Sequence, residues 1–196
     1  MTSKPNSSTQ TYNEAKLKEL VLYVSQKWFG NHRNGSVELN KALFFSDALS
    51  YALLGRSITG VEYVRHPYGP APKGITSVQR SLSMSGDAKI LKFSGPGRPG
   101  PTIIFPQRDA DTSLFTSQEK RVIDLVVSEL EDMVTDDVSE MSHTLDGWRL
   151  AAQGETIPLF TIFLDNALLS EQDIEAGQAV AEQLRGDLVG LTATPA

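Results

Sequence analysis

The segment from Val37 to Leu54 constrains the fold most, because the helix that it predicts is apolar on almost every side. Its apolar residues are Leu39, Ala42, Leu43, Phe44, Phe45, Ala48, Leu49, Ala52 and Leu53. A helix with this pattern has to be covered by other elements all round. Gly55 is well placed to end it, since glycine readily adopts the left-handed conformation after a last helical turn. We therefore predict a central, buried helix.

The segments on either side predict its first neighbours. A Thr-x-x-Glu capping box at Thr11–Glu14 opens a helix that presents one apolar face. Residues Val61–His66 predict a strand, and Gly74–Met84 a short helix. The stretch Pro67–Pro72 contains three prolines, which lack a backbone donor, so we expect a rigid turn without helix or strand pairing there.

The second half predicts a hairpin and more helix. Ile90–Phe93 and Thr102–Phe105 read as hairpin arms, and Thr116 caps an amphipathic helix. Ile157–Leu164 reads as an edge strand or a buried extended segment. Ser170 caps a last amphipathic helix with Ile174, Ala181, Leu184 and Leu188 on one face. The predicted fold class is α+β, mostly helical: a compact domain around the central helix, with a small antiparallel sheet from 61–66, 90–93 and 102–105.

The expected organisation is one domain with two terminal segments. Residues 1–11 are polar and predict a disordered leader without the apolar core of a signal peptide, 12–168 the domain, and 169–190 a C-terminal helix packed on it or appended to it. The absence of cysteine excludes disulfides, thiolate catalysis and cysteine zinc sites. No apolar run is long enough to span a membrane, so no membrane partner is expected. The expected compartment is cytoplasmic.

Charge is divided unevenly along the chain. Residues 1–108 hold 14 Lys and Arg against 6 Asp and Glu, and residues 109–196 hold 4 against 18. The division predicts either two halves that attract each other within the fold or an acidic face offered to a basic partner. We favour the first interpretation. The net charge of −6 argues against general nucleic-acid binding, although the basic half leaves that alternative open.

Motifs for catalysis are weak. The run Gly95–Gly100 is formally G-x-G-x-x-G, but its prolines remove the amides that would bind phosphate and a strand follows instead of a helix. The histidines His32, His66 and His143 form no metal-binding spacing. We therefore expect no catalytic residue, cofactor or metal, and no enzyme.

Two positions have physical interest nonetheless. Asp47 lies in the middle of the apolar helix, where a carboxylate must be paired or hydrogen-bonded; Arg56, Arg65 and Tyr63 are the candidate partners, and we favour a structural salt bridge over a functional acid. Tyr68 lies in the proline-rich turn. A rigid turn with an aromatic ring suits recognition, because little entropy is lost on binding.

At this point the sequence resembles the Panacea domain, the family that includes SocA-like antitoxins and phage-associated proteins. The family pattern combines L-N-K-L-L-(Y/F)-F-x-D, G-R-x-I-T-G and P-x-G-P-x-P. It is matched here by Leu39–Asp47, by Gly55–Gly60 and by Pro67–Pro72, with Tyr63 between them. The C-terminal signatures S-H-x-x-x-x-W and G-x-x-I-P are matched in 142–148 and 154–158. Ala42, where leucine is common, and the Pro/Gly-rich hairpin loop depart from the pattern.

The resemblance implies an antitoxin of a bacterial or phage toxin–antitoxin pair, which binds its cognate toxin directly and blocks it. Some relatives instead deliver the toxin to a protease, so a proteolysis adaptor with a protease or chaperone partner is the alternative; a nucleic-acid-binding regulator is another. The motif residues expected to be structural are Asn40, Lys41, Asp47, Gly55, Arg56, Gly60, His143 and Trp148. The residues predicted to contact a partner are Tyr68, Gly69, Pro70, Arg98, Glu171, Asp173 and Glu175.

Overall fold

A computed structural model describes residues 11–30, 35–95, 98–133 and 141–163. The helices are α1 (Glu14–Lys27), α2 (Ser36–Leu54), α3 (Ile75–Met84), α4 (Ser117–Asp132) and α6 (Asp146–Leu150), with short 3-10 helices η1 (Thr112–Leu114) and η2 (Leu159–Phe163). The strands are β1 (Tyr63–His66), β2 (Gly69–Pro72), β3 (Ala88–Gly95), β4 (Arg98–Pro106) and β5 (Thr156–Ile157). The fold is thus α+β and mostly helical, as predicted.

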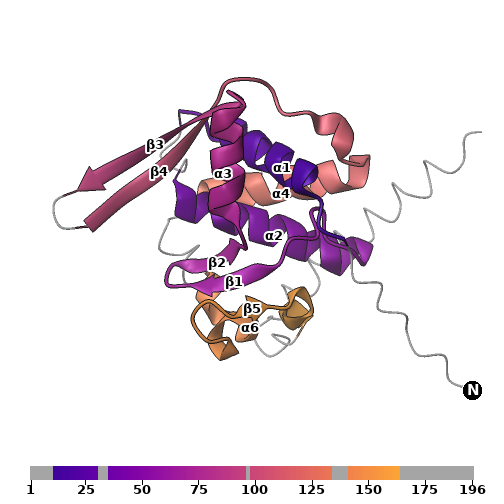
Figure 1. The fold of residues 1–196 in the computed structure, drawn as a ribbon. Coiled ribbons are helices and arrows are strands. Elements are labelled where there is room, and N and C mark those ends of the chain that lie inside the picture. The colour runs from indigo at the N-terminus through magenta and orange to yellow at the C-terminus, as the bar shows by residue number, and fades with distance from the viewer. Residues whose placement is uncertain (1–10, 31–34, 96–97, 134–140, 164–196) are drawn as a thin grey trace, which may run out of the picture.

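Helix α2 is the centre of the molecule (Figure 1). It contacts α1, α4, β2, β4 and η2. Leu43 and Phe44 are fully buried, and the Phe44 ring packs edge-on against Tyr63 of β1. The all-round apolar pattern of the sequence is explained by these several partners, each covering a different side of the helix.

Gly55, Thr116 and the Thr11–Glu14 box are the predicted helix ends that lie among the described residues, and the first two are confirmed. Gly55 ends α2 in the left-handed conformation, and Thr116 and Glu119 form the capping box of α4. The box predicted at the start of α1 is wrong. Asn13 caps this helix instead: its side chain accepts from the amide of Lys16, while its own amide donates to the Thr59 carbonyl at 2.8 Å. That backbone contact fixes Asn13 outside the helix, and α1 begins at the following residue.

The single predicted sheet is also wrong, because the strands form two. One has the order β2-β1-β5 and the other is the β3–β4 hairpin, all antiparallel. The proline-rich stretch supplies β2, which we had expected not to pair. It can pair because β2 is at the edge of the sheet. Lys73 donates its amide to the Glu62 carbonyl at 2.8 Å, which sets the register of the ladder. In that register the backbone nitrogens of Pro70 and Pro72 point away from β1, so their missing N–H groups remove no hydrogen bond to β1.

The β3–β4 hairpin projects from the helical body (Figure 1). Its base packs on α1 and α3, where Ala88 and Ile104 are buried, while Leu91 and Phe93 are about half exposed. The hairpin was predicted, but both strands are longer than expected. The apolar run predicted from 157 as an edge strand or extended segment begins in the edge strand β5, but residues 159–163 form η2 instead of extended chain.

The two oppositely charged parts of the chain meet between α1 and α4. Lys16 binds Glu119 at 2.8 Å, with side chains only 19% and 3% exposed, and Lys27 lies 3.5 Å from Asp124. The Tyr23 hydroxyl also donates to Asp124 at 2.5 Å. The favoured interpretation of the charge division, attraction within the fold, therefore holds for these helices.

None of the helices that the structure describes is long and apolar enough to cross a membrane. The predicted leader (apart from Thr11) and the predicted C-terminal helix lie outside the described residues.

Candidate functional site

Asp47 is fully buried and binds the turn that follows α2. Its Oδ1 accepts from the amides of Ile58 and Thr59 at 2.6 and 2.9 Å, and its Oδ2 accepts from the hydroxyls of Thr59 and Tyr63 at 2.5 and 2.8 Å. Tyr63 was one of the predicted partners. The predicted salt bridge is wrong: the donors to Asp47 in the described part of the chain are neutral, Arg56 is exposed, and Arg65 donates to the Ala151 carbonyl.

Burial dominates the electrostatics of this cluster. It raises the pKa of Asp47 above its usual value, while the hydrogen bonds from Thr59, Tyr63 and Ile58 oppose that shift. Burial and the neighbouring Asp47 together raise the pKa of Tyr63 well above its usual value. Asp47 and Tyr63 are both buried, and the hydrogen bonds of the cluster join α2, the turn and β1; we call it the Asp47 joint.

The G-R-S-I-T-G turn is held at both ends. The Ser50 hydroxyl donates to the Arg56 carbonyl at 2.8 Å. Gly60 has φ of 69°, and a Cβ on it would lie 2.6 Å from the Thr11 carbonyl oxygen. Glycine is therefore required there both for the conformation and for the close approach of the chain entering α1.

Three motif segments distant in sequence meet at Gly69. A Cβ on this residue would lie 2.9 Å from the Ser142 hydroxyl and 3.3 Å from Cε of Lys41, and its φ is 120°. Ser142 and Lys41 are fully buried. The N-terminal motifs and the S-H-x-x-x-x-W segment therefore form one packed unit.

Trp148 fastens this unit to β1. His143 stacks on its ring at 4.0 Å between centroids, and the guanidinium of Arg65 lies 4.2 Å from the ring centroid. Its indole N–H donates to the His66 carbonyl at 3.3 Å. These contacts join His143 and Trp148 to β1, and their structural role stays a prediction. Arg65, which the sequence analysis named as a candidate partner of Asp47, belongs to this Trp148 cluster instead.

Tyr68 directly precedes Gly69 of this unit, and 71% of its surface is exposed. The neighbouring Gly69 and Pro70 are buried, as is the whole of β2. Among the three turn residues predicted to meet a partner, Tyr68 is the one that presents its side chain to solvent. The other two hold its backbone in place.

The remaining predicted contact residues lie elsewhere. Arg98 begins β4, where it pairs with Gly95 in the projecting hairpin. Glu171, Asp173 and Glu175 lie outside the described residues.

Asn40, within α2, has a buried side-chain oxygen without a hydrogen-bond partner among the described residues. The described ranges contain no group of three His, Asp or Glu able to hold a metal.

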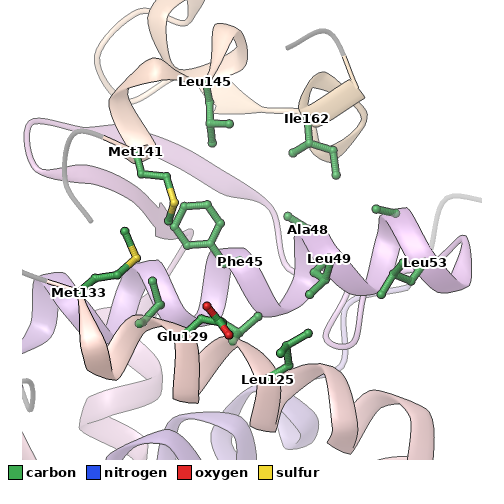
Figure 2. Close-up of a pocket in the computed structure, with 13 residues that line it drawn as sticks. Phe45, Ala48, Leu49, Leu53, Leu125, Glu129, Met133, Met141, Leu145 and Ile162 are labelled. Carbon is green, nitrogen blue, oxygen red and sulfur yellow. The ribbon is translucent and has the colours of Figure 1, made fainter. Parts of the chain in front are cut away.

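An apolar groove that the sequence reasoning missed runs between α2 and α4 (Figure 2). We call it the α2–α4 groove. Its volume is about 570 Å³, and it is lined by Phe45, Ala48, Leu49, Ala52, Leu53, Leu125, Val126, Glu129, Leu130, Met133, Met141, Leu145 and Ile162. The signal in the sequence was the surplus of apolar positions on α2 together with Leu125 and Met133 on α4.

Comparison with known families matches residues 39–149 to the model of the SocA-like antitoxin Panacea domain. This match spans more than half of the chain and includes the Asp47 joint, the Gly69 contact and Trp148. The chain belongs to the SocA-like antitoxin, Panacea-domain family. Neither the curated proteins nor the solved structures contain a match.

Proposed function

We propose that this protein is the antitoxin of a toxin–antitoxin pair and neutralises a cognate toxin by direct protein–protein binding. Family membership supports the class. The observation that carries the mechanism is the exposed ring of Tyr68 on a hairpin whose second strand is wholly buried. An aromatic side chain held on a stiff support loses little freedom on binding, and tyrosine is enriched among residues that dominate interface energies.

The contacts below Tyr68 support its role in recognition. Gly69 packs against Ser142 and Lys41, and Trp148 holds the backbone of β1 through the His66 carbonyl. The ring is thus presented by three segments of the family match rather than by one isolated loop. Arg98 on the projecting hairpin and the acidic residues Glu171, Asp173 and Glu175 are proposed as further contacts, for which charge would supply specificity.

Co-expression with the toxin encoded beside this protein tests the proposal. The wild-type protein should restore growth, and Tyr68→Ala should weaken toxin binding by about 30-fold, the effect of losing roughly 2 kcal/mol at an interface. Met84→Ala is the matched control, because Met84 is 82% exposed on α3 and outside the proposed surface. Equal affinity of the two variants would remove Tyr68 from the interface, and failure of the wild type to rescue growth would refute the antitoxin proposal.

The half-life of the toxin distinguishes the adaptor mechanism from direct blocking. Direct blocking predicts an unchanged toxin half-life in a pulse-chase and inhibition of the purified toxin by the purified protein. A half-life that shortens only when this protein is present would favour delivery to a protease.

A further inference from the structure

The α2–α4 groove presents apolar surface outward. The part of its lining that comes from α2 combines the small residues Ala48 and Ala52 with Leu49 and Leu53. Ala52 is exposed and Leu125 on the opposite wall is 37% exposed. Large and small apolar side chains on a helix surface form the ridges and grooves against which a second helix packs.

The described chain ends beside this groove. Ile162 lines it, and the ring of Phe163 packs on Tyr51 of α2 with centroids 5.9 Å apart. The described residues therefore end at α2, and residues 164–196 of the sequence follow Phe163.

That segment has the pattern and the reach to cover the groove. A helix over 171–188 would be about 27 Å long at 1.5 Å per residue, and residues 164–170 span up to roughly 23 Å when extended. The predicted apolar face of the helix is narrow, as needed for a groove between two helices. Its members are Ile174, Ala181, Leu184 and Leu188.

We propose that the C-terminal segment of this chain forms a helix that seats its apolar face in the α2–α4 groove. Charge supports this occupant: Glu129 is the charged residue among those lining the groove, and Arg185 is the lone Lys or Arg after residue 163. At 100° per residue Arg185 lies at the edge of the apolar face, where it can approach Glu129 and favour one register.

Seating this face orients the acidic residues of the segment. On the same helical projection Glu171, Glu175 and Glu182 lie beside or opposite the apolar face, so they would point to solvent. The helix would complete the domain core and display a row of carboxylates. This inference is independent of the antitoxin proposal, because it concerns contacts within one chain.

Cross-linking tests it directly, since the chain has no native cysteine. Ala52→Cys is combined, in the full-length protein, with a second cysteine at position 174, 181 or 188. Each test position has a control two residues earlier, at 172, 179 or 186, which lies on the opposite helical face. Disulfide formation needs Cα atoms within about 7 Å, so proximity in the groove limits the reaction.

We expect at least one test pair to form an intramolecular disulfide about ten times faster than its control, detected on non-reducing gels and by mass spectrometry. Equal rates for test and control, or no cross-link within the monomer, would overturn the proposal. Cross-links that appear solely in covalent dimers would overturn it in favour of a second copy.

Hydrogen exchange provides a second measurement. Ala181→Asp should increase amide exchange in residues 125–132 of α4, whereas Ala179→Asp, the same change on the opposite face, should not. Unchanged exchange in both variants, or the same increase in both, would contradict a seated helix.

Discussion

The amides of residues 58 and 59 donate their hydrogen bonds to the buried side chain of Asp47. Four hydrogen bonds converge on its two oxygens, from two amides and two hydroxyls. The sequence was sufficient to predict that a carboxylate in an apolar helix needs a partner and that Tyr63 was a candidate. It could not show that neutral donors would be enough, because amides of a tight turn carry no residue-specific signal.

Removing this carboxylate should destabilise the protein strongly. Asp47→Ala leaves the amides of Ile58 and Thr59 buried without an acceptor, and we expect a loss of about 3 kcal/mol in the free energy of unfolding, measured by urea denaturation. Asp47→Asn should cost about 1 kcal/mol, because its oxygen keeps both amides and the hydroxyls of Thr59 and Tyr63 can turn to accept. Glu62→Ala is the exposed control and should change stability by less than about 0.5 kcal/mol.

The pH dependence gives the same residue an independent test. Burial raises the pKa of Asp47 in the folded state above the 3.8 of the free group. The contribution of Asp47 to the free energy of unfolding is therefore greatest in acid and is lost as pH rises through the folded pKa. The penalty of Asp47→Asn should therefore shrink between acid and neutral pH. A penalty that grows with pH would mean that the hydrogen bonds outweigh burial and hold the carboxylate ionised.

At the scale of elements, helices were easier to predict than strand pairing. The periodicity of α2 and α4 and the box at Thr116 are local signals, and they located these helices well. The pairing of β1 with β5 joins residues more than 90 apart, with Tyr63 opposite Ile157. Strand β5 has two residues and carries no pattern of its own, so tertiary packing determines its pairing with β1. Strand β2 was missed because its prolines were judged without knowing which side faced β1.

Gly69 connects the elements that support Tyr68, and its replacement should be costly. Gly69→Ala places a Cβ 2.9 Å from the Ser142 hydroxyl at a φ of 120°, so we expect a loss of about 2–3 kcal/mol by urea denaturation. Gly86→Ala is the matched control: its φ is 78° but nothing lies within 4 Å of the new Cβ. Backbone strain alone should cost it about 1 kcal/mol.

Ser142→Ala should recover part of the loss in Gly69→Ala, since it removes the hydroxyl that the new methyl group meets. The two changes should be non-additive by about 1 kcal/mol in a double-mutant cycle. Additive effects would show that conformation, and not contact with the 141–144 segment, requires glycine at this position.

For the whole molecule, the division of charge along the sequence correctly predicted attraction but not its location. The α1–α4 pairs join the two parts. Arg108 forms a separate charge cluster inside residues 1–108, where it binds Glu19 of α1 at 2.6 Å and Asp87, just before β3, at 2.7 Å. The α2–α4 groove could not be located from the sequence. The surplus of apolar positions on α2 indicates uncovered apolar surface, but not which side of the helix its described neighbours leave open.

Arg108 should make the protein sensitive to acid. Its guanidinium is the main cause that lowers the pKa of Glu19 below 4.5 and that of Asp87 below 3.8. Carboxyl groups with a lowered pKa contribute stability that is fully present above their unfolded values and is lost as pH falls through the folded ones. Wild-type stability should therefore decline below about pH 4.5, against the opposite contribution of Asp47.

Arg108→Met should reduce stability at pH 7 by about 1–2 kcal/mol and flatten the decline in acid. Two opposing effects determine this loss of stability. Glu19 is only 10% exposed and would lose its cation, which increases the loss. Arg108 is 38% exposed and screened by solvent, which reduces it. Arg149→Met removes an exposed pair with Asp146 and should change the midpoint of urea unfolding little at any pH. Parallel pH profiles of wild type and Arg108→Met, measured from pH 3 to 7, would show that Glu19 and Asp87 gain their low pKa values from other groups, and that Arg108 does not bind α1 to the hairpin base through its charge.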